Sequence, residues 1–462
     1  MSEKEKKPLQ EDFEARERTT ADVKEPPAGW KQILAAFGPS FVLAGATVGS
    51  GEIIATPILG AKVGLVMLWA IIASCLIKLP VQEQFGRYAV YSGKSLLTIL
   101  DELPGPRLRA SWAVWWVLFL MTFLLIIMAG IVGVVGLALR GLFGVGSANL
   151  WGLIAGVVGL ALIFRGLYTD LQRVRLVMVV AFSAITVLLA FIVLPFTPYA
   201  PSGQDLLRGL ALHFPKEGWA VALAVFGMTG ITANEMITYT YWVLGKGYSA
   251  WSGPVGSPNW LHRARGWIRV MHWDLVCAAI VYTITTVAFY VLGAAVLAKL
   301  GTIPAGFKVV DQLAAMYTKT VGEWARVLFM IAAFAILYST YIVNTAGFGR
   351  AFPDVLARLR LIKLDTPEAY LFWRRFFTVA SAACMFVLYY LVPRPTVLII
   401  TGGMILGLSL PLAALVALLL DSKLRREQVD LAQPSWLRAL LWVASLGIWV
   451  FTIWGYATGA IK

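Results

Sequence analysis

Eleven long apolar segments follow one another along the chain, each close to the roughly 20 residues that a helix needs to cross a bilayer. Their approximate limits are 33–61, 64–88, 110–138, 149–165, 174–195, 219–244, 271–298, 322–347, 373–392, 395–420 and 436–458. With 59% hydrophobic and 14% charged residues, the chain lacks the polar surface of a soluble protein of 462 residues. We therefore predict an all-α integral membrane protein. Soluble enzymes, nucleic-acid-binding proteins and disulfide scaffolds are excluded.

The basic residues are distributed unequally between the two sides of the predicted membrane. If the amino terminus is cytoplasmic, the cytoplasmic tail and loops carry 28 Lys and Arg residues and the opposite side carries 8. Cytoplasmic loops of membrane proteins are enriched in these residues. The bias predicts a multi-pass protein of the cell membrane with a cytoplasmic amino terminus and an external carboxyl terminus. The net charge of +14 then reflects topology and contact with membrane lipids, not binding to nucleic acid.

The regions outside the apolar segments are short. Residues 1–29 hold eight acidic and six basic side chains and no apolar core, which predicts a disordered cytoplasmic tail before one transmembrane domain, 30–462. The stretch 245–270 is expected to be an interfacial loop, and 304–320 a short amphipathic helix. The three cysteines are isolated and the three histidines share no motif, so we expect no cofactor.

Two apolar segments are interrupted at corresponding places. Residues 45–54 in the first segment and 227–237 in the sixth both place Gly and Thr ahead of a glutamate. These glutamates, Glu52 and Glu235, are 183 residues apart, which suits a five-helix repeat copied once in inverted orientation. Each glycine weakens its helix by roughly 1 kcal/mol, and unwinding frees backbone carbonyl and N–H groups. Broken helices 1 and 6 are typical of the substrate sites of membrane transporters.

The residues at these two breaks form the candidate site. We expect Glu52, Glu235 and Asn234, with carbonyl groups freed near Gly49 and Ala233, to bind a cation. Ser50 and Thr232 complete the set of substrate-binding candidates. The alternative is a structural role, because Thr232 and Glu235 have the spacing of a capping box and Glu52 can stabilise the start of its own half-helix.

Other polar residues within the apolar segments are candidates for gating or coupling. Glu83 and Arg87 have i,i+4 spacing, which favours a structural ion pair or an element of an inner gate, and Lys78 is placed to snorkel or to neutralise Glu83. Asp274 lies close to the start of the seventh segment, a position that favours capping or loop anchoring over proton transfer. Asn344 adds polarity to the eighth segment and is a candidate coupling-ion ligand.

Several short motifs, in order along nearly the whole chain after residue 30, resemble the Nramp family of proton-coupled divalent-metal transporters. They are Gly38-Pro39-Ser40-Phe41, Gln82, Tyr91-Ser92-Gly93-Lys94-Ser95-Leu96, Gly166-Leu167-Tyr168, Asp274, Arg374-Arg375 and Leu410-Pro411. The resemblance implies a LeuT-type fold with two inverted five-helix repeats and, here, an eleventh helix. It also implies transport by alternating access and symport with a coupling ion, and it implies that the chain is not an enzyme.

The metal-site motifs depart from the family. Where the family has Asp-Pro-Gly-Asn in helix one, this chain has Gly49-Ser50-Gly51-Glu52, and for Met-Pro-His-Asn in helix six it has Asn234-Glu235-Met236-Ile237. The acidic residues of helix three are replaced by Ile127-Met128-Ala129-Gly130, and the glutamine of helix ten by Gly402 or Gly403. This chain is therefore identified as a divergent relative of the Nramp transporters.

The remaining donors at the breaks are hard oxygen atoms, which suit Mg²⁺, Mn²⁺ or Ca²⁺ better than softer metals. We expect a transporter of a divalent metal cation. The alternatives are a carrier for an organic amine or amino acid, whose ammonium group the carboxylates would bind, and a relative that transports nothing. The acidic residues of helix three that support proton coupling in the family are absent from this chain. The sequence leaves the oligomeric state open.

Overall fold

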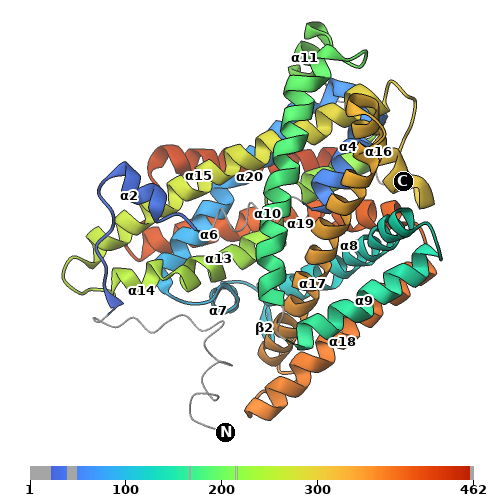
Figure 1. Cartoon of the computed structure of the whole chain (residues 1–462). Coiled ribbons are helices and arrows are strands. Elements are labelled where there is room, and N and C mark those ends of the chain that lie inside the picture. The colour runs from blue at the N-terminus through green and yellow to red at the C-terminus, as the bar shows by residue number, and fades with distance from the viewer. Residues whose placement is uncertain (1–21, 39–48, 166–167, 214, 216, 458–462) are drawn as a thin grey trace.

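A computed structural model of the chain describes residues 22–38, 49–165, 168–213, 215 and 217–457. The described chain is almost entirely helical (Figure 1). Up to residue 210 its elements are α2 (Trp30–Ala35), η2 (Gly51–Ala55), α4 (Thr56–Val63), η3 (Gly64–Met67), α5 (Leu68–Leu76), α6 (Leu79–Ser92), α7 (Leu96–Asp101), β1 (Arg107–Leu108), β2 (Ala110–Ser111), α8 (Trp112–Phe143), α9 (Ala148–Phe164), α10 (Tyr168–Leu188), η4 (Leu189–Val193), η5 (Leu194–Phe196) and α11 (Gly203–Leu210). Those that follow are α12 (Trp219–Met228), α13 (Ala233–Lys246), α14 (Tyr248–Ser252), α15 (Trp260–Leu292), η6 (Gly293–Leu297), η7 (Gly306–Lys308), α16 (Val309–Val321), α17 (Ala325–Arg358), α18 (Pro367–Leu391), α19 (Pro395–Arg426) and α20 (Ser435–Ala457).

Nine helices within the described ranges are long and apolar enough to cross a membrane. One of them, Gly51–Ser92, has 42 residues. At about 1.5 Å per residue it would extend about 63 Å, twice the roughly 30 Å of a bilayer core. It turns at Gly64, where φ is +64°, and so contains two of the predicted crossings. The shorter apolar helix α9 adds a further predicted segment. The helical pattern therefore agrees with the eleven segments predicted from the sequence.

The break predicted in the sixth apolar segment is confirmed. Helix α12 ends at Met228 and α13 begins at Ala233, so four residues between them are not helical. In the first segment, residues 39–48 lie outside the described ranges, and these include the first four residues of the predicted interruption at 45–54. From Ser50 onward the chain is helical and begins with a π-turn, η2, a distortion that is frequent at functional sites.

The predicted loop at 245–270 is wrong over much of its length. It contains α14, and α15 begins at Trp260, well before the predicted start of the seventh segment at residue 271. Ala264 and Trp267 are buried at helical spacing, so the stretch has an apolar face. Arg263 on this helix is also buried. Its guanidinium donates to the carbonyls of Ser252 and Pro258 at 3.0 and 2.9 Å, and these hydrogen bonds offset the cost of burying the charge. The charge of Arg263 lowers the mean hydropathy of this stretch, so hydropathy alone does not predict the helix there.

Two smaller predictions are confirmed. The amphipathic helix expected at 304–320 is α16, with Val309, Leu313 and Met316 buried on one side. The sequence Pro393-Arg394-Pro395 between the ninth and tenth segments also predicts a tight turn, since proline cannot continue a helix interior, and the chain turns there between α18 and α19.

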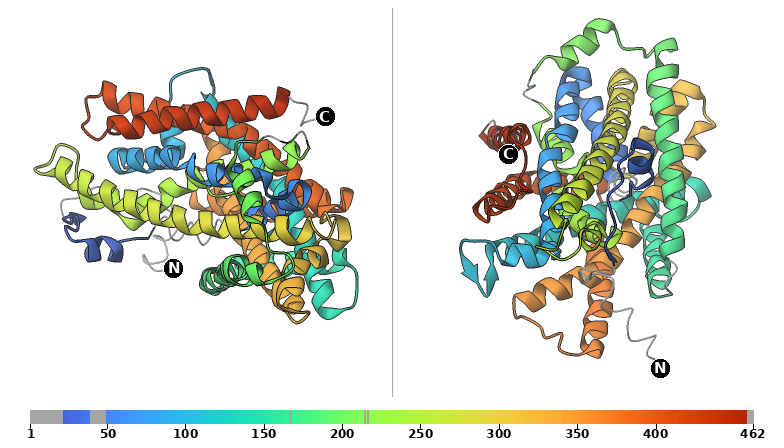
Figure 2. Two further views of the ribbon diagram at one scale, coloured as in Figure 1. Left: turned by 90° about the horizontal axis from the view of Figure 1, so that it is seen from above. Right: turned by 90° about the vertical axis from the view of Figure 1, so that its left-hand side faces the viewer.

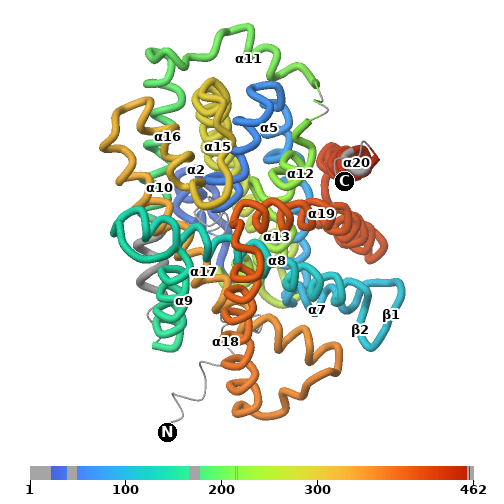
Figure 3. Tube along the Cα trace, turned by 90° about the vertical axis from the view of Figure 1, so that its right-hand side faces the viewer, coloured from blue at the N-terminus to red at the C-terminus, as the bar shows by residue number. Residues whose placement is uncertain are grey.

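The two halves of the broken sixth helix lie in the middle of the helix assembly. Figure 3 shows α12 and α13 between α8, α15 and α19, with α20 at the margin. Helix α12 packs along α19, and α8 packs against both α17 and α19. Helix α20 packs on α19, and the two lie side by side in Figure 2. The break is therefore surrounded by protein, which is the condition for non-helical backbone at membrane depth.

Residues 1–21 of the predicted tail lie outside the described ranges. Its described part contacts the start of the seventh membrane helix. The N–H of Lys24 donates to the carbonyl of Trp251, Trp267 donates to the carbonyl of Lys24, both at 3.0 Å, and Glu25 pairs with Arg263 at 3.4 Å. The segment from residue 22 to 29 therefore lies against α14 and α15.

Candidate functional site at the helix breaks

The break in helix six has a fixed geometry. Gly230 has φ of +64°, a left-handed conformation that side chains disfavour, and an added Cβ would lie 3.2 Å from Cys75. Thr232 then caps α13: its hydroxyl accepts from the N–H of Glu235 at 3.1 Å, and the Glu235 carboxylate accepts from the N–H of Thr232 at 2.8 Å. The capping box weighed as the structural alternative for Glu235 is confirmed.

Glu52 connects the two breaks. It is fully buried, and its two carboxylate oxygens accept from different segments: Oε2 from the N–H of Gly49 at 3.1 Å, and Oε1 from the N–H of Gly230 at 3.3 Å. The backbones approach closely here, because an added Cβ at Gly51 would lie 2.8 Å from the carbonyl oxygen of Met228. Glu52 therefore stabilises the start of its own half-helix and also holds the non-helical segment of helix six.

The side chain of Lys78 reaches the same break. From the sequence, Lys78 was instead expected to snorkel or to neutralise Glu83. Its Nζ donates to the carbonyls of Phe226 and Thr229 at 2.5 and 2.7 Å. These carbonyls lie at the carboxyl end of α12, where backbone oxygens have no helical partner. Lys78 is fully buried, so it does not snorkel, and the carboxylate of Glu83 is held by other partners.

The carbonyls expected to be free near Gly49 and Ala233 are engaged in helices. The Gly49 oxygen accepts from the N–H of Ile53 at 3.0 Å, and Ala233 is the first residue of α13, so its carbonyl enters that helix. Unwinding frees carbonyls at the end of the preceding half-helix, here at Phe226 and Thr229. Ser50 is buried beside Glu52, and Asn234 is partly buried in the first turn of α13.

The donor set at the breaks consists of oxygen atoms from different chemical groups. Among the described residues, no group of three or more His, Cys, Asp or Glu side chains is placed to hold a metal ion. A cation here would be bound by carboxylate, amide and backbone oxygens together. Each oxygen of Glu52 accepts one hydrogen bond from the backbone, which leaves lone pairs on both for a cation. Such ligands suit a hard, partly hydrated cation.

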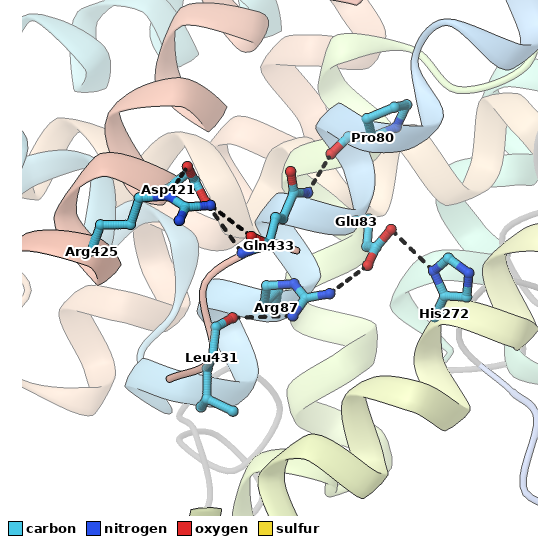
Figure 4. A network of polar contacts seen from close by, with 8 residues as sticks. All are labelled: Pro80, Glu83, Arg87, His272, Asp421, Arg425, Leu431 and Gln433. Carbon is cyan, nitrogen blue, oxygen red and sulfur yellow. Dashed lines mark hydrogen bonds and ion pairs between the residues drawn. The ribbon is translucent and has the colours of Figure 1, made fainter. Parts of the chain in front are cut away.

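The predicted pair Glu83–Arg87 belongs to a larger buried network (Figure 4). The Arg87 guanidinium donates to Glu83 at 2.7 Å and to the carbonyl of Leu431 at 3.1 Å, and His272 of α15 lies 3.1 Å from the second oxygen of Glu83. Gln433, in the α19–α20 connection, donates to the carbonyl of Pro80 at 3.3 Å. The network joins α6 to α15 and to the connection before α20.

That connection is held at its other end by Asp421 of α19. Asp421 pairs with Arg425 at 2.9 Å and Arg438 at 3.3 Å, and it accepts from the N–H of Gln433 at 3.3 Å. An ion pair at Glu83 was predicted from the sequence. The links to His272 and Leu431 were not, because they join residues far apart in the chain.

The two remaining candidates form hydrogen bonds with backbone groups. Asp274 is fully buried and accepts from the N–H of Gly38 at 3.1 Å, so it anchors the approach to the first membrane helix, as the loop-anchoring interpretation predicted. The Asn344 amide donates to the carbonyl of Thr340 at 2.9 Å, one turn earlier in α17.

The stretch of α8 where the related family carries acidic residues packs against α19. A Cβ added at Gly402 would lie 2.4 Å from Ile127, and one added at Gly130 would lie 2.6 Å from Ile399. The two helices therefore pack closely through apolar side chains at these positions. A Cβ added at Gly403, the other candidate for the helix-ten position, would instead lie 2.6 Å from the side chain of Met228.

The arrangement of apolar helices around a central break defines the class: a multi-pass membrane transporter of the LeuT-type fold, with two inverted five-helix repeats and an eleventh helix. A manganese transporter of Eremococcus coleocola has this fold, with a TM-score of 0.67 over 96% of this chain and 90% of its own, at 16% identity.

The chain belongs to the Nramp family: the family described as natural resistance-associated macrophage protein-like matches residues 40–458. It is 27% identical to an uncharacterised protein of Pasteurella multocida, over 78% of this chain and 79% of that protein. It is also 28% identical to the divalent metal cation transporter MntH of Mycobacterium tuberculosis, over 53% of this chain and 54% of that protein. Members of this family are transporters and not enzymes.

Proposed function

We propose that this protein carries a divalent metal cation across the cell membrane by alternating access, and that the cation binds between the two helix breaks. Glu52 carries the argument, because it is a fully buried carboxylate in contact with the backbone of both breaks. A carboxylate at this depth costs several kcal/mol unless a site or pathway uses it. Motion of one repeat against the other would change the distance between its two hydrogen-bond partners.

Asn234 and Glu235 supply the other side of the proposed site. Both lie in the first turn of α13, whose amino end faces the break. With Glu52 they offer two carboxylates and an amide, a set that favours Mn²⁺ or Mg²⁺ over softer metals. The names of the similar proteins, a divalent metal cation transporter and a manganese transporter, support this substrate class.

We further propose that the amino terminus is cytoplasmic and the carboxyl terminus external. The excess of 28 over 8 basic residues supports this orientation. On this topology the Glu83–Arg87–His272 network lies towards the cytoplasm and acts as an inner gate. It joins three parts of the chain that alternating access would move relative to one another.

The test is uptake of Mn²⁺ into proteoliposomes that contain the purified protein. Wild-type protein is expected to take up Mn²⁺ above the level of empty vesicles. Glu52→Gln, which keeps the shape of the side chain and removes its charge, is expected to lose about tenfold to a hundredfold of this uptake, which corresponds to about 1.5–3 kcal/mol for bonds to a charged group. Glu323→Gln, at an exposed glutamate outside the site, is the matched control. Absence of uptake of Mn²⁺ and Mg²⁺ by folded wild-type protein would contradict the proposal.

A further inference from the structure

The most unusual feature of the helix-six break is a lysine at the carboxyl end of α12, where backbone carbonyls have no partner within the helix. In secondary transporters, the carboxyl ends of half-helices and unwound carbonyls are the groups that coordinate coupling cations. Here Nζ of Lys78 already lies 2.5 Å from the carbonyl oxygen of Phe226 and 2.7 Å from that of Thr229. It also lies 5.1 Å from the centre of the Phe226 ring, a cation–π contact.

The hydrogen bonds around Lys78 suit its charged form. The hydroxyls of Ser74 and Thr229 lie 2.8 Å apart, and Nζ of Lys78 lies 3.4 Å from the Ser74 hydroxyl. When Thr229 donates its hydroxyl hydrogen to the carbonyl of Val225 at 2.8 Å, Ser74 donates to Thr229 and accepts from Lys78. Together with the two carbonyls, Lys78 then donates three hydrogen bonds. Three donors are the complement of an ammonium group and one more than a neutral amine has.

The counter-charge is Glu52, and one peptide group connects the two residues. Lys78 binds the carbonyl oxygen of the Thr229–Gly230 peptide, and Glu52 accepts from the N–H of the same peptide. In a trans peptide these two groups point in opposite directions. The ammonium and the carboxylate thus hold the peptide from its two sides, and Lys78 is also attracted by the charge of Glu235. Of these three groups, the Lys78 ammonium and the Glu52 carboxylate are fully buried and Glu235 is partly buried.

We propose that Lys78 is a tethered cation that replaces a freely diffusing monovalent coupling cation at the end of α12. The ammonium supplies the positive charge that the carbonyls of Phe226 and Thr229 would otherwise take from Na⁺ or K⁺. It is a positioning residue, since it acts on the transported ion through the peptide and Glu52. The effect of Lys78 on transport rests on the proposed function. The effect of Lys78 on thermal stability is independent of the proposed function.

The experiment compares wild type, Lys78→Met and the control Lys62→Met, an exposed lysine of the same apolar span, by thermal unfolding in choline, Na⁺, K⁺ and methylammonium chloride at equal ionic strength. The Tm of wild type and of the control is expected to be the same in all four salts. Lys78→Met is expected to unfold at a lower temperature in choline and to regain Tm saturably with Na⁺, K⁺ or methylammonium. A lower Tm that no small cation restores would show a purely structural bond and would overturn the proposal.

The same proteins are then tested for Mn²⁺ uptake. Wild type is expected to work equally in choline and Na⁺. Lys78→Met is expected to lose roughly tenfold or more in choline, as for loss of a buried charged partner, and to recover in part with Na⁺ or methylammonium. Wild-type uptake that requires Na⁺ or K⁺ would overturn the proposal.

Two further outcomes are decided by stability. If folded wild type takes up no metal, the proposed function fails while the Tm comparison still judges Lys78. If Lys78→Met does not fold in any salt, the Tm of the wild type is measured at increasing concentrations of Na⁺ and K⁺. A saturable rise in Tm would contradict the proposal that Lys78 fills the cation position. No rise in Tm, together with a folded Lys78→Arg variant, would support the proposal.

Discussion

The two helix breaks carry glutamates at corresponding positions, yet the structure uses these glutamates differently. Glu235 is partly buried and closes a capping box with Thr232 on its own half-helix. Glu52 is fully buried and reaches across to Gly230 in the other break. The difference teaches that corresponding residues of an inverted repeat need not share a role: one glutamate stabilises a local helix start and the other connects the two halves of the transporter.

The same asymmetry applies to the positive charge. Lys78 binds the carboxyl end of the half-helix in the second repeat and shares a peptide group with Glu52. The second repeat therefore supplies the non-helical backbone, and the first repeat supplies both charged side chains that hold it. Variants at the two breaks can test this division of roles.

The largest effect on stability is expected at Gly230, because both the hydrogen bond to Glu52 and the contact with Lys78 depend on the conformation beside it. Gly230→Ala places a side chain at a positive φ and 3.2 Å from Cys75. We expect a loss of about 1–3 kcal/mol of stability, measured as a lower Tm, and a loss of Mn²⁺ uptake. Gly245→Ala, in the last turn of α13 with no neighbouring atom within 4 Å, should be neutral or stabilising. Equal Tm values for the two variants would contradict the conformational role of Gly230.

A smaller effect is expected at Glu235, where the cap and the cation site can be separated. Glu235→Ala removes the acceptor for the N–H of Thr232 and should cost about 1 kcal/mol of stability, the usual value of a cap. Glu235→Gln keeps a capping acceptor and should restore most of that Tm. If Glu235→Gln has wild-type stability and wild-type uptake, Glu235 is a cap alone and the proposed site is reduced to Glu52 and Asn234.

The smallest effect is expected at Asn344, whose amide binds a carbonyl of its own helix. Asn344→Ala should change stability by no more than about 0.5 kcal/mol and leave uptake unchanged, as for residues away from special features. A large loss of uptake with an unchanged Tm would instead place a ligand for a coupling ion in α17.

The sequence predicted the parts of the fold that depend on local pattern. Apolar length gave the membrane helices, proline spacing gave the turn at 393–395, and the Thr232–Glu235 spacing gave the cap. The start of α15 was missed because its basic residues resemble a loop, although Trp260 and Trp267 are buried.

The contacts within the site could not be predicted in the same way. Lys78 and Phe226 are 148 residues apart, Glu52 and Gly230 are 178 apart, and a backbone carbonyl or N–H leaves no signature in a sequence. A buried lysine was visible in the second apolar segment, but its partners depend on how the two repeats pack.

The central claim is that a divalent cation binds between the two breaks on Glu52. The most direct measurement is a Mn²⁺ anomalous difference map from crystals of the wild-type protein and of Glu52→Gln, grown with Mn²⁺. The account predicts a peak beside the carboxylate of Glu52, within reach of the first turn of α13, that disappears in Glu52→Gln. A peak elsewhere in the membrane region that persists in Glu52→Gln would contradict it.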